Sequence, residues 1–521
     1  MDTGIDPVEP LAGESHGFAS LSEAVPIKCA ENDRYVWIPV ALFGLVYLGF
    51  SLLQCSRLPM WTDELFTYYA ATQPAILDVI HAIREGCDGQ PPLYTLLARF
   101  SLNIFGQAAI AIRFPALLGI GVMCVGLFAF CHRRLRAIEA TVAVLIACHA
   151  SFYFITEGRC YGAVLGCTAL ALLFWQRATE RHSRRAALAG LGLSLACAMA
   201  FHYYSVFLLV PFAVGELVRW KHTRKVDYPV LLAIGVSSLM LLAHLPLITA
   251  ARPMLAHNWA RATPLQAVSF YLEYFGPLIP WCLGSLAIYG LYRLMPDRES
   301  VHARTYRGMP NHEWAACTAL AALPVLMVIA ALSTTGVFTS RYGLFAVVGA
   351  GAIAAAAISK LSRGNRTIPA ILVLTLTIGL ELRLAASLTT PLSLREGQAA
   401  LDVLRQFHGD SRPVLVANDH VFMELWFYRP ELRNRIVHTI DSGLERQYTG
   451  SDTSPLLLSA LRHRVPMRVP DYSEFISSNP KFLLATDGHD WLLRHFVNSG
   501  YSVTAVAHGL LAVDSSGVAT R

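Results

Sequence analysis

Charged side chains are scarce in this sequence. Asp, Glu, Lys and Arg account for 15% of its 521 residues and hydrophobic residues for 54%, whereas a soluble globular domain carries about 25% charged residues. This balance predicts a polytopic membrane protein. The formal net charge of +6 does not indicate a nucleic-acid binder, because Lys and Arg lie in short runs between apolar stretches and not in one basic cluster.

Three further patterns are missing. Residues 1–34 lack the basic start and short apolar core of a cleavable signal peptide and are predicted to form a cytoplasmic tail. No cysteine follows residue 390, and most cysteines fall in apolar segments, so a disulfide framework is not expected. The region after residue 390 also lacks a glycine-rich phosphate loop and an Asp-x-Asp pair, which would hold a metal and a nucleotide sugar.

Long apolar runs dominate residues 35–390, the predicted transmembrane domain. About 20 apolar residues in a helix cross a hydrocarbon core of about 30 Å. Basic runs flank 137–176 and 186–219 on both sides, so the positive-inside rule places their ends in the cytoplasm and each stretch must turn back on itself. Eleven crossings result, at 35–54, 109–131, 137–156, 160–176, 186–201, 203–219, 229–250, 269–291, 314–334, 342–360 and 368–388.

This topology puts the first loop, residues 55–108, and the C-terminal region, residues 392–521, on the outer side of the membrane. In the C-terminal region, short apolar runs alternate with helical patterns such as Val421–Tyr428. The apolar runs are Pro413–Ala417, Arg435–Ile440, Lys481–Ala485 and Leu510–Val513. That alternation predicts a small soluble α/β domain. The predicted fold class is an α-helical polytopic membrane protein of about eleven transmembrane helices with a small extracytoplasmic α/β domain at its C-terminus.

Two adjacent acids open the first outer loop. Ionisable groups near a membrane are costly and therefore mark functional sites by default. The loop contains Trp61-Thr62-Asp63-Glu64 near its start, and Thr62 is expected to cap an amphipathic surface helix. Adjacent helical residues point about 100° apart, so one acid is expected to do chemistry while the other orients or binds. Acids in a first helical turn also complement the helix dipole without any further purpose.

A second group of polar residues lies at the predicted outer ends of later segments. Asp88 and Gln90 precede Pro91-Pro92, a pair that could simply start a helix. A planar guanidinium suits phosphate because it contacts two oxygens at once, although an arginine at an outer helix end commonly just extends to the interface. The group comprises Asp88, Gln90, Tyr94, Glu157, Arg159, Tyr161, His202, Tyr203, Arg341 and Tyr342.

In order and spacing these motifs resemble the GT-C superfamily of membrane glycosyltransferases, specifically its protein-mannosyltransferase-like and lipid A aminoarabinose-transferase-like branch. The resemblance covers roughly residues 35–390. It rests on Trp61-Thr62-Asp63-Glu64, Asp88 to Tyr94 (the family's Asp-x-His-Pro-Pro-Leu-Tyr), Phe105-Gly106, Arg113-Phe114-Pro115, Glu157-Gly158-Arg159-Cys160-Tyr161, His202-Tyr203-Tyr204 and Arg341-Tyr342.

The resemblance implies transfer of a sugar from a polyprenyl-phosphate donor to a lipid, glycan or protein acceptor at the outer face of a bacterial inner (plasma) membrane. Asp63 would be the general base that takes a proton from an acceptor hydroxyl as it attacks and inverts the anomeric carbon. Glu64 would hold the acceptor or orient Asp63. Arg341 would stabilise the departing lipid phosphate, with Arg159 and Arg252 as helpers.

Gln90 departs from the family pattern, which has histidine before the proline pair. An amide is a poorer metal ligand than imidazole and cannot carry a proton at neutral pH. No obligatory metal or other cofactor is therefore expected.

Two other functions are compatible with a chain that has many apolar segments and polar groups among them. A transporter or lipid flippase would place its polar site near the bilayer midplane, often between paired repeats. A surface-polysaccharide polymerase or ligase of another membrane fold would keep the chemistry but move its catalytic residues away from the first loop.

Overall fold

The computed structural model describes residues 37–180, 183–294, 308–362, 365–389, 393–407 and 409–516. The predicted cytoplasmic tail, residues 1–34, lies outside the described residues. The chain divides into two units, Met1–Leu42 and Phe43–Arg521, and the description of the first is confined to the beginning of helix α1 (Trp37–Arg57).

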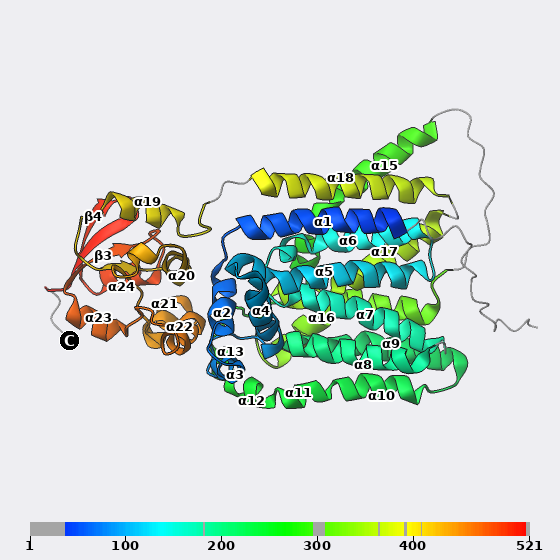
Figure 1. Ribbon diagram of the computed structural model, residues 1–521, viewed down its shortest axis with the longest axis horizontal. Coiled ribbons are helices and arrows are strands. Elements are labelled where there is room, and N and C mark those ends of the chain that lie inside the picture. Colours follow the sequence, from blue (N-terminus) through cyan, green and yellow to red (C-terminus); the bar gives the residue numbers. More distant parts are fainter. Residues whose placement is uncertain are drawn as a thin grey trace, which may run out of the picture. The chain divides into compact units, whose positions relative to one another are not determined.

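Apolar helices form a bundle from the first part of the chain, and each predicted membrane segment coincides with a helix or a series of helices (Figure 1). By length and composition, five helical stretches within the described residues could cross a membrane: Ala108–His132, Arg184–Phe201, Gln266–Leu294, Asn311–Ser333 and Thr367–Thr389. The count of eleven crossings stays a prediction. The longer helices after α1 are α5 (Ala108–His132), α6 (Ala137–Ala150), α7 (Tyr161–Thr179), α8 (Arg184–Phe201), α9 (Leu209–Thr223), α16 (Asn311–Ser333), α17 (Ala346–Ser362) and α18 (Thr367–Thr389).

Two predicted segments are broken helices. Segment 229–250 consists of α10 (Tyr228–Ser237), α11 (Leu239–Ala243) and α12 (Leu245–Ala250), and Pro246 lies in the first turn of α12. Segment 269–291 consists of α14 (Gln266–Phe275), the 3-10 turn η4 (Gly276–Leu278) and α15 (Ile279–Leu294), with Pro277 at the break. Proline lacks the amide hydrogen that a continuous helix needs. Further short helices are η2 (Phe152–Ile155), η3 (Tyr203–Leu208), α13 (Pro253–Ala256) and η5 (Ser340–Gly343).

Glycines allow α5 and α7 to pack backbone against backbone. A Cβ atom at Gly162 in α7 would overlap the backbone of Ala116 in α5, and one at Gly119 would overlap the backbone of Gly162. Small residues at such contacts are typical of membrane helices, because association there depends on close van der Waals packing. This contact places the beginning of α7 at Tyr161, with Arg159 just before it, beside α5.

We predict that Gly162→Ala destabilises the bundle. The added methyl has no space, and overpacking of this kind costs about 1–3 kcal/mol. The apparent unfolding temperature of the purified protein should fall. Gly235→Ala in α10 is the matched control, since nothing lies within 4 Å of a Cβ at that position; equal effects of the two changes would contradict the packing argument.

Three short helices lie within residues 55–108, the loop that the sequence predicts to be the first outer loop: α2 (Thr62–Ala71), α3 (Ile76–Arg84) and α4 (Pro92–Phe105). The prediction that Thr62 caps α2 is wrong. Thr62 is the first helical residue and Trp61 is the cap, whose N–H donates to the Glu64 carboxylate at 3.1 Å. The Glu64 carboxylate, three residues after Trp61, therefore satisfies the N–H of the cap residue and fixes the direction in which α2 begins.

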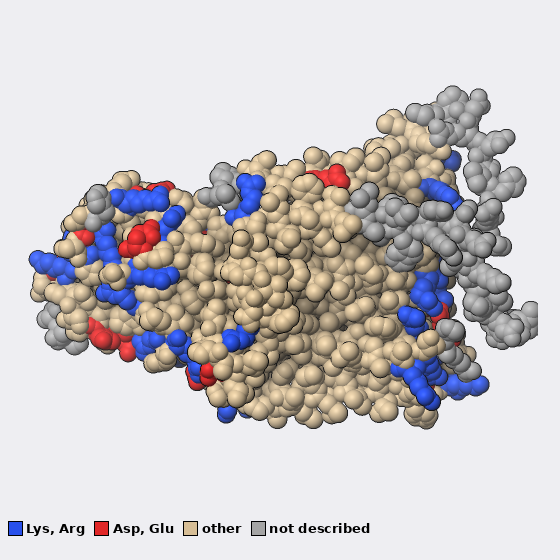
Figure 2. All heavy atoms as spheres, in the orientation of Figure 1, with Lys and Arg blue, Asp and Glu red and all other residues tan. Residues whose placement is uncertain are grey.

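Charged groups are distributed unevenly over the bundle. Figure 2 shows a broad band with few charged side chains over the bundle, and Lys and Arg lie at the end opposite α2–α4 and again over the C-terminal region. Ion pairs at that end include Arg134 with Glu313 at 2.6 Å and Arg219 with Asp227 at 2.6 Å. The band matches a hydrocarbon layer, since charge is costly inside one.

The C-terminal region contains a five-stranded sheet with strand order β2-β1-β3-β5-β4, which confirms the predicted α/β character. β1 is parallel to β2 and β3, whereas β5 is antiparallel to β3 and β4. The strands are β1 (Val414–Val416), β2 (Ile436–Val437), β3 (Lys481–Ala485), β4 (Ser502–Ala507) and β5 (Leu510–Asp514), and the helices are α19 (Gln398–Gln406), α20 (Asp419–Tyr428), η6 (Pro430–Leu432), α21 (Ser442–Thr449), α22 (Thr453–Arg462), α23 (Tyr472–Ser478) and α24 (Trp491–Asn498).

One apolar core joins this sheet region to the first outer loop. It includes Phe66 and Tyr69 of α2 together with Phe422 and Trp426 of α20. Polar contacts reinforce the core, as the Met60 N–H donates to the Tyr428 hydroxyl at 2.7 Å. The loop that carries the two predicted acids is therefore held by the bundle and by the C-terminal region.

Candidate active site

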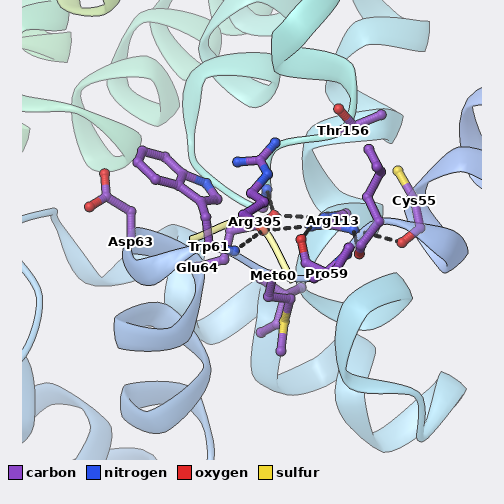
Figure 3. Close-up of polar contacts among 12 residues, drawn as sticks. Cys55, Pro59, Met60, Trp61, Asp63, Glu64, Arg113, Thr156 and Arg395 are labelled. Carbon is purple, nitrogen blue, oxygen red and sulfur yellow. Dashed lines mark hydrogen bonds and ion pairs between the residues drawn. The ribbon is translucent and has the colours of Figure 1, made fainter. Parts of the chain in front are cut away.

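Glu64 and Arg113 form a buried ion pair under the first outer loop. Their side chains are 0% and 1% exposed, and the guanidinium holds the carboxylate through two contacts, Nε–Oε1 at 2.7 Å and Nη2–Oε2 at 2.6 Å (Figure 3). The same carboxylate accepts the Gly158 N–H from the α6–α7 connection. All five N–H donors of Arg113 are used, because the rest donate to the carbonyl oxygens of Cys55, Leu58 and Pro59.

We predict that Glu64→Gln destabilises the protein by about 3 kcal/mol, because breaking a buried pair leaves one charge uncompensated. Unfolding of the purified protein measures this change. Arg462→Gln removes an ion pair with the largely exposed Asp471 and should have a much smaller effect. A similar shift for both variants would show that the Glu64 pair does not hold the loop.

The Asp63 side chain points away from that of Glu64 (Figure 3). Its Oδ2 lies 3.0 Å from Nη1 of Arg341, at η5. Its backbone oxygen accepts from Arg159 Nη1 at 2.9 Å. Asp63 is half-buried, so its carboxylate is held by a cation and still accessible. This geometry agrees with the prediction that the side chains of Asp63 and Glu64 do not both enter one site.

Arg159 is the centre of a buried polar cluster beneath Asp63. Its Nη1 lies 3.1 Å from Asp88 Oδ2 and 2.7 Å from Thr67 Oγ1. The Gln90 amide, oriented with its oxygen toward the guanidinium, accepts from Arg159 as well. Burial opposes the charged form of Arg159, but the attraction of Asp88 and Asp63 outweighs it and raises the pKa of Arg159. The cluster ties the loop before α4 to the start of α7.

Aromatic rings surround the Arg341 guanidinium. Its central carbon lies 5.6 Å from the Trp61 ring, 5.5 Å from the Trp259 ring and 6.0 Å from the Tyr161 ring. Such contacts hold a cation in place without neutralising it. Arg341 Nε is buried and has no hydrogen-bond partner among the described residues. One strong donor of this group is therefore free for a ligand.

His202 lies next to this aromatic group, with its ring 4.9 Å from Tyr342 and 5.8 Å from Tyr161. Burial, with Arg159 and Arg341 nearby, lowers the pKa of His202 to about 3. Its Nδ1 accepts the Tyr204 N–H at 3.2 Å. His202 is thus neutral at pH 7 and packs against the aromatic rings near Arg341.

A cavity of about 300 Å³ opens beside Arg341. Glu157 Oε2 is buried at its edge without a hydrogen-bond partner among the described residues. Burial, and next the negative charge of Glu64, raise the pKa of Glu157 to about 7, while Arg341 opposes the shift. The cavity is lined by His149, Ala150, Tyr153, Phe154, Glu157, Trp259, Glu273, Tyr274, Pro277, Thr339, Ser340, Arg341 and Arg383.

The raised pKa of Glu157 makes stability depend on pH. Between the usual pKa of a glutamate and about 7, the folded state binds more protons at this group than the unfolded state does. Its contribution to the free energy of unfolding is therefore complete at low pH and is lost as pH rises through about 7. Glu157→Gln should remove this loss, so the unfolding temperature of the variant minus that of wild type should grow from pH 5 to pH 8. A constant difference would contradict the assignment.

The structure does not bring every predicted site residue to this place. Tyr94 is buried and donates to the Ile112 carbonyl at 2.7 Å, which joins α4 to α5. The Tyr203 ring lies 6.0 Å from His244, beside the break before α12. Arg252 is exposed, and among the described residues it makes no ion pair or side-chain hydrogen bond with the cluster around Arg341. Its predicted role as a helper has no support in the geometry.

Several residues of the site were not singled out from sequence. Thr67, Trp259 and Glu273 lie in ordinary amphipathic or loop contexts that carry no distinctive signal. Arg383 lies inside the last apolar segment, where a charged residue is a recognised functional signal. Among the described residues, no group of three or more His, Cys, Asp or Glu side chains could hold a metal ion, and independence of an obligatory metal stays a prediction.

Comparison with known proteins supports the fold. The family model for dolichyl-phosphate-mannose-protein mannosyltransferase matches residues 89–248. The crystal structure of ArnT from Cupriavidus metallidurans bound to undecaprenyl phosphate is similar with a TM-score of 0.55 and 12% identity over 94% of this chain and 99% of that one. Its apo form gives 0.55 and 11% over 92% and 98%. No curated protein matches by sequence. The structural similarity extends beyond residue 390, where the sequence resemblance was expected to end.

Proposed function

We propose that this chain, an integral membrane protein with the fold of the GT-C glycosyltransferases, transfers a sugar from a polyprenyl-phosphate donor to an acceptor at the outer face of the membrane. The supporting observation is the Asp63 carboxylate, which lies 3.0 Å from Arg341 beside a cavity with unsatisfied polar atoms. The family match at residues 89–248 includes Gln90, Arg159 and His202. The similar ArnT structure holds undecaprenyl phosphate.

Asp63 is the general base of the proposed reaction. An acceptor hydroxyl attacks the anomeric carbon, its proton passes to Asp63, and the bond from that carbon to the phosphate oxygen breaks with inversion. Glu64 cannot do this, since it is 0% exposed and already accepts from Arg113, Trp61 and Gly158. Glu64 instead orients Asp63 by fixing the start of α2.

Arg341 binds the leaving phosphate. The phosphate gains negative charge as the bond to the sugar breaks, and a fixed cation stabilises that charge in a site with little water. Arg341 already contacts Asp63, and its Nε is free. Arg341 therefore contacts both the base and the leaving group. The sugar must then lie between Asp63 and the phosphate.

The outer face is the proposed location because of the charge distribution along the bundle. The basic residues that predict cytoplasmic loops, among them Arg134 and Arg219, lie at the end opposite α2 (Figure 2). Asp63 lies at the other end, away from the bundle centre where a transporter or flippase would bind its cargo. The C-terminal region lies over this end through its core with α2, and Arg395 lies 5.9 Å from the Trp61 ring.

Asp63→Asn tests the proposal. We expect transfer from a labelled polyprenyl-phosphate sugar to fall by about 100-fold or more, while the protein still inserts, folds and binds the carrier. Membranes containing each variant are offered a panel of labelled donors, and loss of label from lipid is followed.

Asp78→Asn is the matched control, because Asp78 is also in the first turn of an outer-loop helix and there caps the Ala75 N–H. It should keep the wild-type rate. Full activity of Asp63→Asn would remove Asp63 from the mechanism. Carrier movement across vesicles without any glycosyl product would favour the flippase.

A further inference from the structure

Arg383 is a cation inside an apolar helix without a carboxylate partner. It lies within the last two turns of α18, and among the described residues it makes no ion pair. Its Nη1 donates to the His149 carbonyl at 2.9 Å. Its guanidinium carbon lies 4.1 Å from the Phe152 ring and 5.4 Å from the Tyr153 ring. These contacts attach it to the end of α6 but leave its charge uncompensated.

A structural role explains only part of this arrangement. The His149 carbonyl belongs to the last turn of α6, where a cation is favourable because of the helix dipole. One donor satisfies that carbonyl, however, whereas Arg113 in the same protein uses all five of its donors. A charged residue within a membrane helix is unfavourable unless other groups compensate its charge. The contacts that Arg383 makes with the protein therefore do not explain why a cation is kept at this position.

Arg383 and Arg341 line the same cavity, from α18 and from η5. Arg341 contributes a buried Nε without a partner there. Two acids also line the cavity: Glu273, which accepts from Ser340 Oγ at 2.5 Å, and Glu157, whose pKa of about 7 leaves it partly neutral. The volume of about 300 Å³ is at the small end of ligand pockets, which fits a phosphate with part of a sugar.

We propose that Arg383 is a second phosphate-binding residue, which together with Arg341 holds the phosphodiester of the donor in this cavity. The inference rests on the proposed function and adds to it a residue of the last apolar helix. A phosphodiester offers two non-bridging oxygens, and a guanidinium binds such oxygens in pairs. With Arg341 on the side of Asp63 and Arg383 on the side of α6, the phosphate is fixed in orientation as well as in position.

Binding of a long-chain polyprenyl phosphate to the purified full-length protein in lipid nanodiscs tests this inference, with the matching polyprenol as a probe that lacks the phosphate. Trp259 lines the cavity, so tryptophan fluorescence reports occupancy. We expect Arg383→Gln to weaken polyprenyl phosphate binding about tenfold or more, as loss of a charge-assisted contact does, and to leave polyprenol binding unchanged. Arg383→Lys keeps the charge and should weaken binding less.

Arg433→Gln is the matched control. Arg433 likewise donates to a backbone carbonyl, that of Trp426 at 2.8 Å, and lies 5.6 Å from an aromatic ring, but it belongs to the C-terminal region and not to the cavity. It should bind polyprenyl phosphate as wild type does. Thermal unfolding without ligand identifies variants that fail to fold; if Arg383→Gln is one of them, Arg383→Lys decides.

The outcomes separate the two proposals. Wild-type affinity in a folded Arg383 variant, with wild type still preferring the phosphate probe to polyprenol, would overturn the role of Arg383 alone. Equal binding of polyprenyl phosphate and polyprenol by the wild-type protein would instead overturn the donor class assigned under the proposed function. Weaker binding of both probes to Arg383→Gln would identify Arg383 as a structural anchor of α6 and contradict the inference.

Discussion

The buried pair of Glu64 and Arg113 is the constraint on which the site depends. Arg113 donates to three carbonyl oxygens at the end of α1 and in the following loop. Glu64 accepts the Gly158 N–H and so connects them to the α6–α7 connection. Because Glu64 is fixed inward, its neighbour Asp63 must point outward. The ion pair with Arg341, 278 positions later in sequence, follows from that direction. Burial of the two charges costs desolvation energy. Its structural effect is to fix the position of the Asp63 carboxylate.

Much of the fold was predictable because its signals are local. Apolar length, basic runs and short alternating runs depend on neighbouring residues, and they locate the bundle helices and the strands β1, β2, β3 and β5. The meeting of Asp63, Arg159 and Arg341 was predictable for another reason, namely that a series of weak motifs agreed with a known family in order and spacing. Opposite directions for Asp63 and Glu64 followed from helix geometry alone.

The remaining features depend on contacts between distant segments. Segment 229–250 contains Pro246, but its apolar length predicted a single continuous span. Where its helix breaks depends on packing against other segments of the chain. β4 is an edge strand with an exposed pattern, which carries little hydrophobic signal. Tyr94 and Arg252 have the same residue types as the tyrosines and arginines that do lie at the site. Only tertiary packing, which the sequence pattern does not reveal, places them elsewhere. That Arg383 makes no ion pair among the described residues becomes visible only from the positions of the carboxylates in the fold.

The central claim is that the Asp63 carboxylate and the Arg341 guanidinium act on one bound ligand. An experimental structure of the full chain in a lipid nanodisc with a polyprenyl-phosphate sugar would test it most directly. The account predicts the phosphorus atom within about 4 Å of the Arg341 guanidinium, at charge-assisted hydrogen-bond reach, with the anomeric carbon facing Asp63. A phosphate bound elsewhere, for example in the apolar groove between α8 and α10, or a ligand that touches neither side chain, would contradict it.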